Sequence, residues 1–353
     1  MPTAPEPGGT EPAVFDESRL DDETALLRAD VALRALAEAG ARVRREVGLA
    51  AEATELAVGA NIGDFRPRAV VAAGPDSRLL RAVLEPSCPV PFVAWPGPSL
   101  PGWAGPLDLV VVLAPAGSDA GAASAVAEAV RRGCQLVVAC PARSMVAEHA
   151  TGRYSTLLPA SSGDQLATAV VMLELLARVD LGPEADAEEV ATALDQVAIS
   201  CSPHRDLAVN PAKSLAIAFA DSTPLVWGGS VLAARAARRV AEKLRHASGR
   251  AALAGDAEHL LPVISAATNR DLFADPFSDA VDSDRRPALL VLDDGSADVL
   301  VREQRGRLLS AAQERRVRVE TLTTDHGNEV ARYASLLASG AYVAAYLEVG
   351  LGR

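Results

Sequence analysis

The stretch Asn210-Pro-Ala-Lys-Ser, with Thr223-Pro-Leu-Val-Trp-Gly-Gly-Ser shortly after it and a polar run to Arg245-His246, decides the fold of this chain. Asn suits a helix N-cap, and the Pro that follows suits the first helical position. The apolar residues after Thr223 are typical of a buried strand, and Gly-Gly-Ser is typical of a tight turn. The stretch therefore predicts helix, strand, turn and helix, which is half of a parallel unit that binds phosphates or nucleotides at its glycine-rich turn.

Similar apolar runs recur on both sides of this stretch. Strands are predicted at 69–73, 90–95, 108–113, 136–140, 155–158, 224–227, 250–254, 287–292 and 317–322. Helices are predicted between them at 77–84, 122–132, 165–179, 187–200, 231–245 and 299–315, with a closing helix at 327–350. The strands are continuously apolar, which indicates parallel sheets covered by helices on both faces. The two halves repeat one plan, so we expect an α/β fold with two doubly wound, flavodoxin-like subdomains.

Four segments follow from this pattern. Residues 1–18 begin with Pro, Gly, Thr and Glu and are expected to form a disordered tail. Apolar residues between Asp22 and Leu56 recur at helical spacing, which predicts an N-terminal helical segment over 19–62. The first subdomain is predicted at 63–203 and the second at 204–353. An acidic loop is expected at 269–286.

Composition excludes several classes of function. The net charge is −12, from 46 acidic and 34 basic residues, so the chain repels nucleic acid and anionic membranes. The four cysteines form no Cys-x-x-Cys pair, and no His-x-His or His-Glu-x-x-His pattern occurs, so neither a metal nor a cofactor is expected. The N-terminus lacks a signal peptide's apolar core, and no stretch has the roughly 20 apolar residues of a membrane span. The sequence thus predicts a cytoplasmic protein.

Ligands of doubly wound sheets bind beyond the carboxyl ends of the strands. The candidate loops there are 74–77, 117–119, 229–230 and 293–296. Each has a structural alternative, because Ser230, Asp293, Asp294 and Ser296 also suit turns and helix caps. In the first loop Pro75 removes a donor and Asp76 opposes an anion. Lys213 could reach a substrate or be a solvated surface lysine.

In three segments the chain resembles the sugar isomerase (SIS) proteins, and in particular the bifunctional phosphoglucose/phosphomannose isomerase family. The first segment contains Asn210-Pro-Ala-Lys and Pro224-Leu-Val-Trp-Gly-Gly-Ser. The second contains Leu107-Asp-Leu-Val-Val-Val and Arg131-Arg-Gly-Cys-Gln-Leu-Val-Val, and the third runs from Leu336-Leu to Tyr346-Leu. The resemblance implies two SIS subdomains, a homodimer, and a site between subdomains for a sugar phosphate of the hexose 6-phosphate class. It also implies aldose–ketose isomerisation through an enediol. Phosphate or substrate contacts would come from Gly74, Ser77, Gly117, Ser118, Gly229, Ser230 and Lys213.

The chain departs from the family at the residues that carry the chemistry. Ala114-Pro-Ala-Gly-Ser-Asp replaces a Ser/Thr-rich phosphate loop, and Lys243-Leu-Arg-His-Ala has no carboxylate where the family has its catalytic Glu. A Glu-Leu-Asn-His-like segment has no counterpart between Gly255 and Asp275, and the family's late Lys would fall after Arg353. We therefore expect a degenerate branch whose catalytic residues are unknown and whose isomerase activity is open.

Two pairs of side chains are weak candidates for acid–base chemistry. Glu242 and His246 lie one helical turn apart and could form either a displaced acid/base pair or a surface ion pair. Glu258 and His259 could supply a shifted base and acid. The sequence thus supports a sugar-phosphate-binding relative of glucose 6-phosphate and mannose 6-phosphate isomerases. The alternative is a non-enzymatic phosphosugar sensor, or a dimeric scaffold that binds a partner protein.

Overall fold

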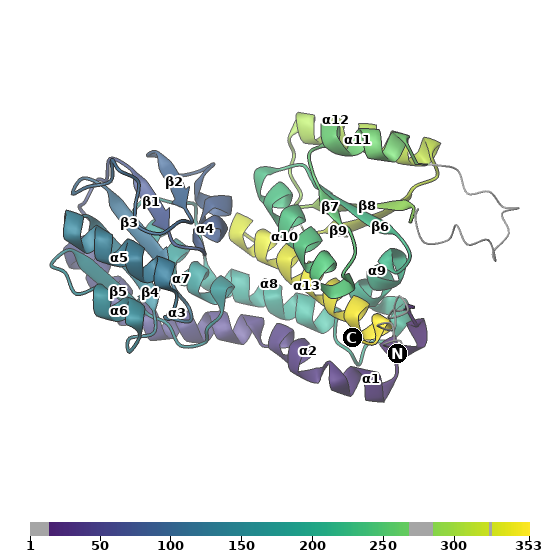
Figure 1. Ribbon diagram of the computed structural model, residues 1–353, viewed down its shortest axis with the longest axis horizontal. Coiled ribbons are helices and arrows are strands. Elements are labelled where there is room, and N and C mark those ends of the chain that lie inside the picture. Colours follow the sequence, from purple (N-terminus) through teal and green to yellow (C-terminus); the bar gives the residue numbers. More distant parts are fainter. Residues whose placement is uncertain (1–13, 268–284, 325–326) are drawn as a thin grey trace, which may run out of the picture.

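The computed structural model describes residues 14–267, 285–324 and 327–353. It contains two parallel sheets, one from each half of the chain, with long helices running between them (Figure 1). The α/β class and the two doubly wound subdomains are therefore confirmed.

The first sheet has the strand order β2-β1-β3-β4-β5, which is the flavodoxin-like order. Its strands are β1 (Val70–Ala73), β2 (Phe92–Trp95), β3 (Leu109–Leu113), β4 (Gln135–Cys140) and β5 (Ser155–Pro159). Helices α5 (Ala120–Arg132) and α6 (Met145–His149) cover one face, whereas α4 (Ser77–Leu84) and α7 (Gln165–Arg178) cover the other. The switch in strand order lies between β1 and β3, so the loops after these two strands flank it.

Within the described residues, the second sheet repeats this order with four strands, as β7-β6-β8-β9. Its strands are β6 (Thr223–Gly228), β7 (Leu253–Ala254), β8 (Pro287–Asp293) and β9 (Arg318–Thr323). Helix α10 (Val231–Ser248) packs on one face, and α11 (Ala257–Ser265) and α12 (Val299–Glu314) pack on the other. The shared order supports a duplicated unit, in agreement with the shared rhythm of the two halves of the sequence.

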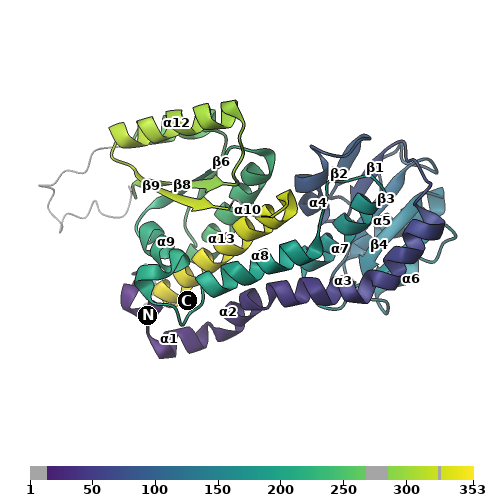
Figure 2. The same ribbon diagram turned by 180° about the vertical axis from the view of Figure 1, so that it is seen from behind.

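Helices from both halves join the sheets into one body (Figure 2). The N-terminal part contains η1 (Glu17–Leu20), α1 (Glu23–Arg28), α2 (Asp30–Ala37), α3 (Ala39–Leu56) and the π-helical turn η2 (Ala57–Asn61). Helix α8 (Ala187–Ser200) packs on both α3 and the closing helix α13 (Glu329–Leu351), and η3 (Leu207–Val209) leads into α9 (Pro211–Phe219). One hydrophobic core runs through these helices and the facing sides of both sheets. Since α8 packs on elements of both halves, the predicted boundary at residue 203 stays a prediction.

Several local expectations need correction. Helices α6 and α11 were missed, because one is only five residues long and the other contains Pro262. The strand expected at 250–254 is reduced to β7, two residues long. The tail expected at 1–18 ends earlier, because Glu17 and Ser18 begin η1 and Asp16 donates its backbone N–H to Gly350 O. Residues 1–13 of the expected tail, and residues 269–284 of the acidic loop, lie outside the described residues.

Helix α13 is the one helix of the described ranges that is long and apolar enough to cross a membrane. Two thirds of its most apolar window, 67%, is buried inside the protein. Its neighbours are α8, α9 and α10, so its apolar sequence is explained by its place in the core.

Candidate functional site

The carboxyl edge of the first sheet brings together the loops after β1 and β3. Gly74 adopts φ +87°, and a Cβ there would lie 3.5 Å from the backbone of Ala122 in α5. Gly117 adopts φ +70°, and a Cβ there would lie 2.4 Å from the Ser144 Cβ. Both positions therefore require glycine for conformation, and Gly117 requires it also because the loop packs against the cap of α6. The sequence predicts both loops as ligand-binding, and the fold places them side by side.

The polar side chains of these two loops differ in availability. Ser77 is buried at the first position of α4, and its Oγ has no hydrogen-bond partner among the described residues. Ser118 is exposed. Asp119 accepts a hydrogen bond from Ala122 N at 2.7 Å and so caps α5. The edge therefore has two serine hydroxyls, one buried and one exposed, and two carboxylates, Asp76 and Asp119, of which Asp119 is engaged in capping α5.

Asp76 is the central charged group of this edge. It is half-buried, and its Oδ1 accepts a hydrogen bond from Gln165 Nε2 at the start of α7. Burial raises the pKa of its carboxyl, and the negative charge of Asp119 adds to this, whereas Gln165 and Arg239 of α10 oppose it. Helix α10, from the second subdomain, contacts α4, which begins directly after the β1 loop of the first subdomain.

A cavity of about 400 Å³ opens at this edge, between the two subdomains. Its walls come from α2, α3, α4, α7, α8, α10 and α13: Leu36, Ala39, Arg42, Leu79, Asp164, Gln165, Leu166, Leu194, Arg239, Glu242, Lys243, His246, Leu337, Ala338 and Ala341. Arg42 and Asp164 form an ion pair at 2.7 Å, with only 17% and 20% of their side chains exposed. This pair fixes the start of α7, because Asp164 also caps that helix.

Buried Glu46 of α3 holds the loop that leads into α7. Its carboxylate accepts hydrogen bonds from Ser161 N at 2.9 Å and from Ser162 N at 2.5 Å. Gln165 is therefore positioned by two side chains of α3, Arg42 and Glu46. Sequence reasoning missed this arrangement, because contacts spanning more than a hundred residues leave no local pattern.

Glu242 and His246, the first weak acid–base candidates, both line this cavity. The ion pair predicted between them is not formed. Instead the Glu242 carboxylate lies 3.6 Å from Arg239 Nη1, and both Glu242 and His246 are exposed. The two side chains thus share a wall of the cavity without binding each other.

The loops of the second sheet form a separate group. A Cβ on Gly228 would lie 2.2 Å from the Ala233 carbonyl carbon, and one on Gly229 would lie 2.3 Å from Val301 Cγ1. Ser230 Oγ accepts a hydrogen bond from Ala233 N at 3.0 Å and donates one to Asp294 Oδ2. The Gly-Gly-Ser turn therefore packs against α12 and caps α10. Arg239, the first cavity residue of α10, lies nine residues beyond Ser230, and Lys243 lies 13 residues beyond it, so roughly 13 to 20 Å separates this turn from these two cavity residues.

Lys213 is neither solvated nor open to a ligand. It is fully buried, and its Nζ donates hydrogen bonds to Asp21 Oδ1 at 2.6 Å, Pro203 O at 3.0 Å and Arg205 O at 3.1 Å. The ammonium also lies 5.7 Å from the centroid of the Tyr346 ring. All three donors are in use, so the expectation of a solvated lysine is wrong, and Lys213 joins the N-terminal segment to α9 and α13.

Glu258 and His259 lie on α11, across the second sheet from α10. Glu258 forms an ion pair with Arg307 of α12 at 2.6 Å, and His259 Nδ1 lies 4.0 Å from Asp256. Both are exposed on the outer helical layer, so the fold does not bring them to the cavity.

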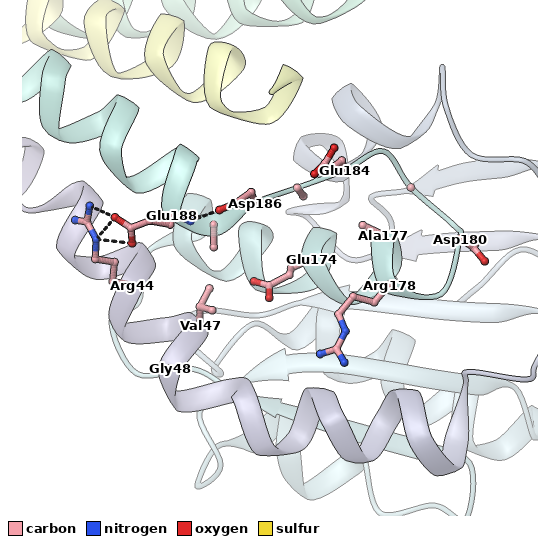
Figure 3. A pocket seen from close by; sticks show the side chains of 13 residues that line it. Arg44, Val47, Gly48, Glu174, Ala177, Arg178, Asp180, Glu184, Asp186 and Glu188 are labelled. Atoms are coloured by element: carbon pink, nitrogen blue, oxygen red, sulfur yellow. Dashed lines mark hydrogen bonds and ion pairs between the residues drawn. The ribbon is translucent and has the colours of Figure 1, made fainter. Parts of the chain in front are cut away.

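A larger hollow of about 940 Å³ lies between α3, the end of α7 and the start of α8 (Figure 3). Its charged lining is Arg44, Glu174, Arg178, Asp180, Glu184, Asp186 and Glu188. It borders the C-terminal end of α7, at the opposite edge of the first sheet from the ligand loops. Because carboxylates outnumber cations there, this hollow does not suit an anionic ligand.

The family comparison matches residues 208–353 to the bacterial phospho-glucose isomerase C-terminal SIS domain. No curated protein shows significant sequence similarity to the chain. Among solved structures, the chain resembles tagatose-6-phosphate ketose/aldose isomerase from Escherichia coli, with 13% identity and a TM-score of 0.64, over 88% of this chain and 91% of that one. It also resembles the C-terminal domain of glucosamine-fructose-6-phosphate aminotransferase from Francisella tularensis, with 13% identity and a TM-score of 0.59, over 94% and 97%.

A third similar structure is a glucose-6-phosphate isomerase like protein from Thermus thermophilus, with 18% identity and a TM-score of 0.51, over 94% of this chain and 92% of that one. These likenesses establish the fold. Together with the family match, they confirm the SIS resemblance that the sequence indicates.

Proposed function

Because residues 208–353 match a phosphoglucose isomerase SIS domain and the whole chain has the two-subdomain SIS fold, we propose that the protein binds a sugar phosphate between its subdomains. The ligand is of the hexose 6-phosphate class, and isomerase activity is lost or strongly reduced. No cofactor takes part. The protein acts in the cytoplasm as a homodimer, without nucleic acid or membrane partners, as the resemblance and the net charge of −12 favour.

The observation that carries this proposal is the position of the 400 Å³ cavity. It lies at the carboxyl edge of the first sheet, beside the β1/β3 switch point where doubly wound sheets bind their ligands. Both subdomains line it, and its lining combines cationic, amide and apolar groups. The positive end of the α4 dipole and the unpartnered Ser77 hydroxyl lie at the same edge.

The expected loss of activity follows from the proton transfers of an aldose–ketose isomerase. A base must move a proton between C1 and C2, and an acid must help to open the ring. Glu242, the carboxylate of α10 in the cavity, is exposed and faces Arg239, and none of Lys243-Leu-Arg-His-Ala is acidic. Removing one proton-transfer group typically lowers the rate by about 10²- to 10⁴-fold.

A second candidate function rests on Glu242 and His246 lining one cavity. In this alternative the pair acts as a displaced base and acid, and isomerisation survives. The non-enzymatic alternative, a scaffold for a partner protein, predicts that no hexose phosphate binds.

Two measurements separate these alternatives. Thermal-shift titrations compare glucose, mannose and fructose 6-phosphates with the free hexoses; stabilisation by the phosphates alone supports the proposal. Coupled assays with fructose 6-phosphate and mannose 6-phosphate then test turnover in the wild-type protein and in Glu242→Gln. Turnover at ordinary enzyme rates, abolished in Glu242→Gln, would establish the second candidate, and no thermal shift with any phosphate would favour the scaffold.

A further inference from the structure

One wall of the interdomain cavity is basic. Arg239, Lys243 and His246 are spaced i, i+4 and i+7 on α10, so their side chains share one face of the helix. Arg239 has a partner in Glu242, at 3.6 Å, and Arg42 on α3 is paired with Asp164. Lys243 is exposed and makes no hydrogen bond or ion pair with any described residue. The wall therefore carries an uncompensated positive charge in a protein whose net charge is −12.

Gln165 lines the opposite side of the cavity, and its Nε2 donates a hydrogen bond to Asp76 Oδ1. Asp76 and Asp119 belong to the loops after β1 and β3 and do not themselves line the cavity. A phosphate placed between these loops would meet two carboxylates. In addition, Gly117 packs on Ser144, and Ser118 is the one hydroxyl side chain in residues 114–119. The β3 loop thus has the wrong charge for an anion, although its position suits a ligand.

We infer that the anionic end of the ligand binds Lys243, Arg239 and His246 on α10, and that its hydroxyl groups face Gln165 at the start of α7. This inference rests on the proposed function and specifies the orientation of the ligand in that site. The ligand class is a polyhydroxylated molecule with one terminal anion. Cationic donors hold an anion with charge-assisted hydrogen bonds, whereas an amide oxygen accepts hydrogen bonds from hydroxyls.

The test measures binding of glucose 6-phosphate, glucuronate, glucose and inorganic phosphate by calorimetry, at low salt, because salt screens exposed charges. Four variants are compared with the wild-type chain. Lys243→Met and Arg239→Met remove charges from the basic wall, and Ser118→Ala removes the hydroxyl of the β3 loop. Arg238→Met removes the same charge from an exposed neighbour on α10 that does not line the cavity.

We expect glucose 6-phosphate to bind wild type more tightly than glucuronate does, and glucose to bind too weakly to measure. Lys243→Met and Arg239→Met should each weaken glucose 6-phosphate binding by about tenfold or more, as loss of a charge-assisted hydrogen bond does. Ser118→Ala should remain within about threefold of wild type, because the inferred orientation makes no contact with the β3 loop. Arg238→Met should do the same, because a surface charge outside the site has little effect.

Each other result overturns a different statement. If the wild-type chain binds none of the four molecules, the proposed function fails and the inference fails with it. A second outcome is that glucose 6-phosphate binds wild type, and that Ser118→Ala abolishes this binding whereas Lys243→Met does not. The ligand would then lie on the β3 loop, so the inference would fail and the proposed function would stand. Equal losses in Lys243→Met and Arg238→Met would reduce the effect to general electrostatics and would also overturn the inference.

Discussion

Replacing Lys213 with Met tests whether this lysine is structural or ligand-binding. The substitution keeps an unbranched side chain of similar length but removes an ammonium that donates three hydrogen bonds, to Asp21, Pro203 O and Arg205 O. We expect a less stable protein whose affinity for hexose phosphates is unchanged, because none of these contacts lies in the cavity.

The expected loss of stability in Lys213→Met depends on how well Asp21 tolerates the loss of its partner. Breaking a buried charge pair costs about 3–5 kcal/mol. The side chain of Asp21 is 55% exposed and can be rehydrated, so the lower end applies. With an unfolding entropy of about 2.1 cal/mol/K per residue, a chain of this length loses roughly 4 °C of Tm for about 3 kcal/mol.

The assay combines thermal unfolding with glucose 6-phosphate titration, and Lys243→Met is the matched control. Lys243 is exposed, so its replacement should change Tm by less than about 1 °C while weakening the ligand. The two lysines should therefore show opposite patterns. A Lys213→Met protein with wild-type Tm and reduced affinity would refute the structural role assigned to Lys213.

Two further predictions concern the loops at the strand ends. Folding raises the pKa of the Asp76 carboxyl, so its protonated form favours the folded state at low pH, and this contribution to stability is lost as pH rises through the folded pKa. Asp76→Asn should therefore raise Tm near pH 7.5. The increase in Tm should shrink toward about pH 4. A Tm difference between variant and wild type that is constant across this range would contradict it. Gly228→Ala should lower the free energy of unfolding by about 1–3 kcal/mol, because the added Cβ would lie 2.2 Å from the Ala233 carbonyl carbon. Gly306→Ala in α12 should raise the free energy of unfolding by about 0.5–1 kcal/mol, because the added Cβ has no atom within 4 Å. Denaturant unfolding of the two variants checks this pair, and equal effects of the same sign would be inconsistent with it.

Most elements of the fold follow from local sequence patterns. The continuous apolar runs 108–113 and 287–292 predict buried parallel strands, and the structure places β3 and β8 at the centres of the two sheets. Asn210 and Pro211 predict the start of α9, and both lie where the pattern put them. These predictions succeed because strand burial and helix capping depend on a few neighbouring residues. Helix α11 was missed because Pro262 lies inside it, where its packing on the second sheet offsets the lost hydrogen bond.

The sequence by itself determined the fold class, the duplicated plan and the loops at the strand ends, since each depends on short-range periodicity. Tertiary structure decided which charges meet. It buried Lys213, separated the Gly-Gly-Ser turn from the cavity, and brought Arg42, Gln165 and Arg239 to one site from three helices. The physical reason is that charge interactions depend on distance and burial, which chain order does not specify when the partners lie far apart in sequence.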